Sequence, residues 1–416
     1  MQQIYQSPAS RPYVYSTLIM VILVLVFSSC EIIQEVSMIE DPYPVEFKDG
    51  KLYPGDYGSH KQFGRHIDIW ENYALIGSGK ENGAYIFRNK ANQWEEMEKL
   101  ELRANYGIGD ICFKEDWILL GTEYANGSGK VDVFRIEDEE IEFKQEIHSN
   151  VKEDRFGSAI DVSGNYMIIG SKAAWNECEN CGTNSDPGKV YIYKLNGEEW
   201  TLDSDFDANP PRENDKFGRE VAISDNFAFV KGGKKDTVYV YSNLDGQWAF
   251  HSYLCPEPVD VLEKEFEQHF GQSVQVEGPN LMIGASTYPV NGLQDRMGAV
   301  YYYELQEGNA WVYKEKIINP NSVPREEVNE FGSTMKMAGD YMIVGGNTNY
   351  IGGGVVYKNT GSQWVNIHYI SPPDDLVSHG FGISMDISDQ WMLVGHIGDM
   401  DTGTEAGAVY VFENNY

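Results

Sequence analysis

The sequence predicts an all-β fold, a seven-bladed β-propeller of four-stranded antiparallel blades, and three observations carry that prediction. An aromatic-glycine pair opens the same pattern seven times. Each copy then contains an apolar run typical of a strand that is covered on both faces. The last copy lacks a fourth strand, and a spare strand precedes the first copy. Self-similarity at a period of roughly 20–50 residues marks a repeat architecture. The pairs are Phe63-Gly64, Tyr106-Gly107, Phe156-Gly157, Phe217-Gly218, Phe270-Gly271, Phe331-Gly332 and Phe381-Gly382.

The third copy, Phe156 to Trp200, illustrates the first two strands of a repeat. Ile160 and Val162 alternate with other residues after the glycine, as expected for a strand whose side chains have period two. A Ser-Gly-Asn turn follows, and residues 166–169 are then apolar at every position. Such a run indicates a second strand that is buried on both faces. The counterparts in the other copies are residues 73–76, 117–120, 227–230, 281–283, 341–344 and 391–394.

The third strand of this copy is Lys189–Tyr193, and the fourth begins at Trp200. The second copy lacks such a Trp, and we expect Phe143 in its place. Four antiparallel strands with buried middle members need a neighbouring sheet on each face, and a closed ring of small sheets meets that need. An open solenoid would need polar caps, which neither end shows. The other tryptophans expected at this position are Trp94, Trp248, Trp311 and Trp364.

The two ends of the repeat region predict how the ring closes. The seventh copy ends with its third strand, Ala408–Phe412, four residues before the C-terminus. Residues 45–54 resemble residues 311–320, the fourth strand and exit of the sixth copy. We therefore predict that the N-terminal strand completes the last blade, which joins the two ends and covers an exposed edge.

The first 30 residues have the pattern of an export signal and not of the fold. Leu18 to Phe27 is an unbroken apolar run of ten residues, too short to span a bilayer. The run ends in Phe-Ser-Ser-Cys30, which resembles a bacterial lipobox, although Phe27 departs from the usual Leu. The resemblance implies a lipoprotein signal peptide over residues 1–29, lipidation of Cys30, a tether over residues 30–43 and the propeller over residues 44–416. An ordinary secretory signal is the alternative.

Composition narrows the classes of partner. The chain has 64 acidic and 32 basic residues, a formal net charge of −32. A nucleic-acid partner is not expected, because binding phosphate needs a basic surface. Anionic head groups are disfavoured for the same reason, so we expect membrane attachment through the lipid anchor only. The expected location is the cell envelope, at the outer membrane, on its periplasmic or its outer side. A protein or glycan partner is expected there.

Four other cysteines lie beyond the lipobox. Cys178 and Cys181 form a Cys-Glu-Asn-Cys segment in a polar loop, where a local disulfide is expected in an exported protein. A redox motif would be expected beside a βαβ pattern, and a zinc site would need two further ligands. Cys112 alternates with apolar neighbours and is expected to be buried, whereas Cys255 has no evident partner.

The repeat resembles the FG-GAP repeat, and the resemblance covers residues 63–412. The fifth copy carries it best, with Phe270-Gly271, then Ile-Gly-Ala at residues 283–285 and Gly-Ala-Val-Tyr-Tyr at residues 298–302. The resemblance implies an integrin alpha-like seven-bladed propeller and a role in binding or adhesion more often than in catalysis. Integrin-like repeats that bind calcium carry an Asp-x-Asp/Asn-x-Asp-Gly loop, and no copy here has one. No cofactor is therefore expected, and Asp399 and Asp401 are weak calcium candidates.

Loop lengths predict which face would bind a ligand. Connections between strands one and two, and between three and four, are short and share one end of the propeller. The remaining connections are long and share the other end; we call it the long-loop face. Insertions are also tolerated without a function. Trp175, Tyr288 and Tyr350 are candidates to stack on a ligand there, or simply to pack within their loops. The long connections are residues 171–188, 203–216, 256–269, 285–298, 319–330 and 396–407.

No catalytic residue is predicted. Paired carboxylates, a Ser/His/Asp set and a sialidase-like Asp box are not recognisable in the sequence. Asp154 and Asp215 recur two residues before the repeat Phe, which favours hydrogen bonding in a turn. Three hypotheses follow: a non-catalytic envelope module for a protein or glycan, a polysaccharide-active hydrolase or lyase with acids at the axial mouth of the long-loop face, and a structural subunit of a larger complex.

Overall fold

A computed structural model divides the chain into two units, Met1–Pro42 and Tyr43–Tyr416, and the second contains all the residues that the structure describes. The described residues are 50–80, 83–102, 107–149, 155–172, 188–207, 216–232, 236–256, 268–288, 297–319, 330–346, 352–370 and 380–414. In these ranges the only helical element is a 3₁₀ turn, η1 (Ala125–Gly127).

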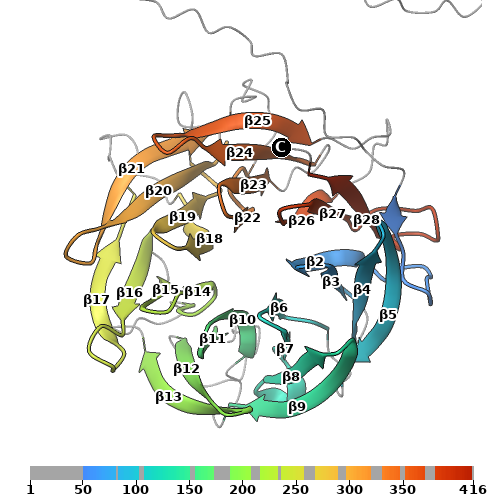
Figure 1. The fold of residues 1–416 in the computed structure, drawn as a ribbon, viewed down its shortest axis with the longest axis horizontal. Helices are drawn as coiled ribbons and strands as arrows, with labels where there is room; N and C mark the ends of the chain where they lie inside the picture. Colours follow the sequence, from blue (N-terminus) through green and yellow to red (C-terminus); the bar gives the residue numbers. More distant parts are fainter. Residues whose placement is uncertain are drawn as a thin grey trace, which may run out of the picture. The chain divides into compact units, whose positions relative to one another are not determined.

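Seven four-stranded antiparallel sheets form a ring, with the first strand of each sheet at the centre and the fourth at the rim (Figure 1). The all-β, seven-bladed propeller is thus confirmed. The blades, in chain order, are β2 (Phe63–Trp70), β3 (Tyr73–Ser78), β4 (Gly83–Lys90) and β5 (Gln93–Glu101); β6 (Asp110–Lys114), β7 (Trp117–Thr122), β8 (Lys130–Glu137) and β9 (Glu140–His148); β10 (Phe156–Ser163), β11 (Tyr166–Ser171), β12 (Lys189–Asn196) and β13 (Glu199–Asp207); β14 (Val221–Ile223), β15 (Phe227–Gly232), β16 (Thr237–Ser242) and β17 (Ala249–Leu254); β18 (Phe270–Glu277), β19 (Asn280–Ala285), β20 (Ala299–Gln306) and β21 (Ala310–Ile318); β22 (Thr334–Ala338), β23 (Tyr341–Gly346), β24 (Gly353–Asn359) and β25 (Trp364–Ile370); and β26 (Phe381–Ile387), β27 (Trp391–His396) and β28 (Ala408–Glu413) with β1 (Lys51–Leu52).

The ring closes through the N-terminal strand, as predicted. β1 pairs antiparallel with β28, with Lys51 opposite Tyr410 and Leu52 opposite Val409. The N–H of Phe63 donates to the carbonyl of Ala406 at 3.0 Å, which extends the junction toward the long-loop face. The two ends of the propeller therefore complete one sheet and bury Leu52 in a core shared by the first and last blades.

Glycines allow neighbouring blades to meet through their main chains. Gly64 of the first aromatic-glycine pair has a φ of 85°, in the left-handed region that favours glycine. A Cβ there would lie 2.8 Å from the carbonyl oxygen of Ala408 and 2.9 Å from a Val409 methyl group of the last blade. The glycine of the motif is thus needed for close approach between blades, which explains its recurrence.

In five of the seven blades, a tryptophan at or beside the fourth strand joins the blade to the one before it. Trp200 of β13 lies against Trp117 of β7, with ring centroids 5.4 Å apart and an interplanar angle of 73°. Trp94 of β5 packs against Trp391 of β27 in the same way. The expectation for Phe143 was wrong. Strand register places Ile141 opposite Ile136, as Trp200 lies opposite Leu195, so Phe143 falls two residues further and packs at the surface against Phe134.

Candidate functional site

The first strands line the central channel with alternate residues, so each blade contributes a side chain at each level. One level, the middle ring, holds Asp68, Asp161, Gln275, Lys336 and Asp386, five residues after the repeat Phe. Strand register gives blade two Cys112 at this level, because Cys112 pairs with Leu119 as Asp68 pairs with Leu75. A second level, the upper ring, lies two residues earlier, toward the long-loop face: His66, Asp110, Ala159, Glu220, Ser273, Thr334 and Ser384.

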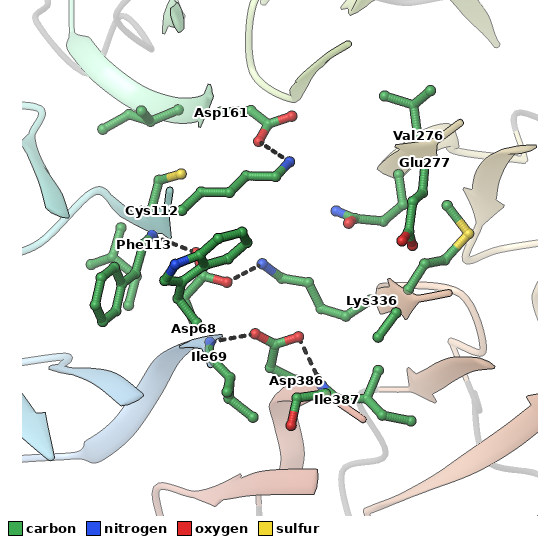
Figure 2. A pocket seen from close by; sticks show the side chains of 18 of the residues that line it. Asp68, Ile69, Cys112, Phe113, Asp161, Val276, Glu277, Lys336, Asp386 and Ile387 are labelled. Carbon is green, nitrogen blue, oxygen red and sulfur yellow. Dashed lines mark hydrogen bonds and ion pairs between the residues drawn. The ribbon is translucent and has the colours of Figure 1, made fainter. Parts of the chain in front are cut away.

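Two adjoining cavities occupy the channel. The larger, of about 630 Å³, is also lined by residues of the short turns, among them Glu71, Gly339 and Asp389, so it opens at the short-turn end. Figure 2 shows the acidic and basic side chains that surround it. The smaller, of about 290 Å³, lies at the long-loop end. The two cavities share the lining residues Asp110, Ile111, Glu220, Gln275 and Lys336.

The channel carboxylates bind the main chain of the next blade. Asp386 Oδ2 accepts the N–H of Ile69 at 2.6 Å, and Asp68 Oδ2 accepts the N–H of Phe113 at 2.8 Å (Figure 2). Because the first strand has no partner strand on its inner edge, its N–H groups need acceptors from elsewhere. The carboxylates supply them at five of the seven junctions; the other three contacts are Asp110 with Ile160, Asp161 with Ile223 and Glu220 with Val274. At a sixth junction, Glu277 accepts the N–H of Gly339 in the turn after β22.

Two lysines compensate part of this negative charge. Lys336 Nζ lies 2.8 Å from Asp68 Oδ1 (Figure 2). Lys114 Nζ lies 3.3 Å from Asp161 Oδ1. Burial disfavours the ammonium of Lys336, but Asp68 and Asp386 outweigh that effect and hold the Lys336 pKa well above its usual value. The carboxylate of Asp161 raises the pKa of Lys114. Both lysines therefore remain charged at neutral pH.

Three acids of the channel hold their protons more strongly than usual. Burial raises the pKa of Asp110 to about 7. Burial, together with the charge of Asp110, raises the pKa of Glu220 to about 8. Burial also raises the pKa of Asp386 well above its usual value, although Lys336 opposes the shift. In the upper ring, burial and the nearby Arg65 lower the pKa of His66 to about 4, so its imidazole is neutral. The channel therefore carries less charge at neutral pH than its composition implies.

The calcium candidates Asp399 and Asp401 lie at the ring closure and share a lysine. Lys51 Nζ is 3.0 Å from Asp399 Oδ2 and 2.7 Å from Asp401 Oδ2. The hydroxyl of Tyr53 donates to Asp401 at 2.9 Å. The ammonium occupies the space between the two carboxylates, so a calcium ion would have to displace it. Among the described residues, no group of three or more His, Cys, Asp or Glu side chains is arranged to hold a metal.

Only one of the three aromatic candidates belongs to the described residues. Tyr288 is buried, and Lys316 Nζ lies 2.6 Å from its hydroxyl and 4.0 Å from its ring centroid. Stacking on a ligand would require Lys316 to move. Trp175 and Tyr350 lie outside the described ranges, as do Cys30, Cys178 and Cys181. Cys112 is buried, as expected, and lines the larger cavity, whereas Cys255 is exposed; neither forms a disulfide.

The channel was not predicted as a unit from the sequence. Its signal was present in five copies, where a charged or amide side chain stands five residues after the repeat Phe. The second copy hides the pattern, since Cys112 stands six residues after Tyr106, and the fourth has Ala222 at this level. Carboxylate pairs that are close along the chain therefore do not reveal a ring whose members come from different blades.

Comparison with protein families supports the repeat assignment. Residues 364–412 match the model of the FG-GAP repeat. The matched segment runs from β25 of the sixth blade through β28 of the seventh, so it starts at a Trp-bearing outer strand. A search of curated proteins finds no match. Within the described ranges, no helix has both the length and the apolar character needed to cross a bilayer.

Proposed function

We propose that the protein is a non-catalytic binding or scaffold module of the cell envelope that engages a protein or glycan through its long-loop face. The supporting observation is the use of the channel acids. Six carboxylates, one at each of six blade junctions, accept main-chain N–H groups of the next blade. An acid that secures the fold in this way is constrained in position and in hydrogen bonding. The recurrence of these acids is thus explained by their structural role, without a role in catalysis.

The strand bounds support the choice of face. β11 ends at Ser171 and β12 begins at Lys189, and β17 ends at Leu254 while β18 begins at Phe270. At the opposite end, β10 ends at Ser163 and β11 begins at Tyr166. Binding residues are commonly found on long connections held by a rigid scaffold. The blades form such a scaffold, and the strand ends that the long connections join share one end of it.

Capture of partners tests this proposal. The wild-type chain and variants with shortened 171–188 and 256–269 connections are used to recover partners from cell-envelope extracts. A matched control carries Glu71→Gln and Asp389→Asn at the short-turn end, where both residues are exposed. We expect the loop variants to lose partners that the control retains. Recovery of the same partners by all variants contradicts the proposal.

The location is part of the proposal. Lipidation of Cys30 would anchor the chain at the outer membrane, on the periplasmic or the outer side. One acyl chain gives only marginal membrane binding, and stable anchoring needs more than one. The several acyl chains on the cysteine of a lipoprotein are therefore expected to anchor it stably. Cys30→Ser is expected to move the protein from the membrane fraction to the soluble fraction. Sedimentation of that variant with membranes would contradict an anchor at Cys30.

A polysaccharide-active hydrolase or lyase is the second candidate, and one observation favours it. Asp110 and Glu220 line the cavity at the long-loop end, and their raised pKa values of about 7 and about 8 suit a general acid. Incubation with neutral and acidic polysaccharides, followed by assays for new reducing ends and unsaturated products, separates the candidates. Product formed by the wild type and abolished by Glu220→Gln would replace the binding proposal with the enzyme.

A further inference from the structure

Hydroxyl and amide side chains from three consecutive blades line one side of the cavity at the long-loop end. β18 contributes Gln272 and Ser273, and β26 contributes Ser384. Ser333 and Thr334 come from the start of β22. Hydroxyl and amide groups both donate and accept hydrogen bonds. One wall of the channel mouth is therefore polar, uncharged and able to bind groups of either kind.

The remaining lining adds apolar surface and charges of both signs, since Arg65 and Lys336 are basic and Asp110 and Glu220 are acidic. Ile67, Ile111 and Ile383 contribute aliphatic side chains, and His66 is neutral. Lys336 is paired with Asp68 at 2.8 Å. Two acids thus balance the two basic side chains of the lining, so the cavity presents no excess of cations of the kind that a phosphate group requires.

Two equivalent serines differ in their hydrogen bonding. Ser273 and Ser384 each stand three residues after the repeat Phe, in blades five and seven. Ser273 Oγ donates to the carbonyl of Gly332 in the next blade at 2.7 Å. Ser384 is 8% exposed, and its Oγ has no hydrogen-bond partner in the structure as described. A buried hydroxyl without a partner is unfavourable. This oxygen has almost no exposed surface, so a ligand hydroxyl could satisfy it after a small rotation of the Ser384 side chain.

We infer that this cavity binds a neutral hexopyranose unit of a glycan, with Ser384, Thr334 and Gln272 as hydrogen-bonding residues. The inference rests on the proposed function, because it names the ligand class of the long-loop face. A pyranose presents several hydroxyl groups, each a donor and an acceptor, around an apolar ring. Its chemistry matches a wall of hydroxyl and amide groups beside three isoleucines. The volume of about 290 Å³ lies just below the usual range for small-molecule sites, which fits one sugar ring.

Saturation-transfer NMR on the full chain tests the inference with D-glucose, D-galactose, D-mannose and N-acetyl-D-glucosamine as probes. The site variant is Ser384→Ala combined with Thr334→Val. The control is Gln390→Ala, on the same blade but lining the short-turn cavity. We expect transfer to at least one sugar with the wild type and the control, and about tenfold weaker binding in the site variant. Since Ser384 Oγ lacks a partner, Ser384→Ala alone is expected to leave the melting temperature unchanged or raised.

The outcomes separate this inference from the proposed function. Absence of transfer to all four sugars, or equal affinity in the site variant, overturns the inference. Partner capture that still depends on the long loops would then leave the proposed function standing. Transfer that the site variant weakens, together with capture that no longer depends on those loops, would support the sugar site and contradict the proposed capture by the long loops.

Discussion

Asp386 of the last blade accepts the main-chain N–H of Ile69 of the first blade, with 2.6 Å between Oδ2 and N. The other carboxylate oxygen accepts the N–H of Ile387 on its own strand at 2.8 Å. One side chain therefore satisfies donors on both sides of the junction where the ring closes. Five further carboxylates repeat the inter-blade contact around the channel. The inner edges of the blades are thus joined by side chains, whereas the cores between blades are apolar.

This contact predicts different effects for two substitutions of Asp386. Asp386→Ala leaves the buried N–H of Ile69 without an acceptor and is expected to cost about 1–3 kcal/mol in the free energy of unfolding. Asp386→Asn retains an oxygen acceptor and is expected to cost less. Chemical denaturation measures both. Asp389→Ala, exposed on the adjacent turn, is the control and should change stability by no more than about 0.5 kcal/mol. Equal losses for Ala and Asn would contradict the role of the carboxylate as an acceptor.

Ring closure predicts that deletion of residues 44–54 destabilises the whole propeller. The deletion removes β1, exposes the edge of β28 and removes Leu52 from the core shared by the first and last blades. Because every blade depends on two neighbours, one cooperative transition at a lower temperature is expected. Differential scanning calorimetry measures it. An unchanged melting curve would count against closure by the N-terminal strand.

The contact of Lys51 with Asp399 predicts that removing the charge of Lys51 lowers the free energy of unfolding strongly. The Asp399 side chain is fully buried (0% exposed), and Lys51 Nζ lies 3.0 Å away. Lys51→Met keeps an apolar side chain of similar length but leaves a buried carboxylate without its cation, which is expected to cost about 3 kcal/mol. Lys80→Met removes the Lys80–Glu405 pair, whose side chains are 49% and 48% exposed, and should cost no more than about 1 kcal/mol. Urea denaturation compares the two, and similar losses would refute the distinction.

The packing of Trp200 on Trp117 predicts the cost of opening a blade junction. Trp200 is 1% exposed, so Trp200→Ala is expected to cost about 3–5 kcal/mol. Phe143→Ala is the control, because Phe143 is 36% exposed and contacts Phe134 within its own blade; its expected cost is about 1 kcal/mol. Denaturation curves measure both. A control as costly as Trp200→Ala would contradict the assignment of these two residues to core and surface.

The fold could be predicted from the sequence because the pattern that produces each blade is local and recurs in every copy. Each apolar second strand, such as residues 166–169, indicates burial on both faces, and the closing strand is visible as a missing element at one end and a spare one at the other. Register was harder to predict. Phe143 is aromatic and close to the expected position, but the pairing of Ile136 with Ile141 is fixed by the length of the turn.

The channel could not be predicted in the same way, because its residues come from different blades. Asp386 and Ile69 are separated by 317 positions, and only a closed ring brings them together. Asp110 and Glu220 appeared as two of many acids in a chain with 64. They line the same cavity, and burial raises their pKa values. Both features depend on packing, which composition does not encode.

Asp110 and Glu220 also predict how stability depends on pH. Their folded pKa values of about 7 and about 8 exceed the ordinary values of 3.8 for Asp and 4.5 for Glu. Over the interval between these values the folded chain holds protons that the unfolded chain has lost. The contribution of these acids to stability is therefore fully present below about pH 4 and is lost as pH rises through 7 and 8. Each acid adds a slope of at most about 1.4 kcal/mol per pH unit.

The double variant Asp110→Asn with Glu220→Gln isolates that slope. Other acids titrate in both proteins, so the difference between the two unfolding free energies reports the pair. We expect the variant to gain stability relative to the wild type as pH rises from about 5 to about 8, since Asn and Gln avoid the cost of ionisation in the channel. The positive charges of Lys336 and Arg219 reduce that cost, whereas Asp68 adds to the cost at Asp110. Urea denaturation across this pH range measures the difference, and a constant difference would show that neither acid titrates abnormally.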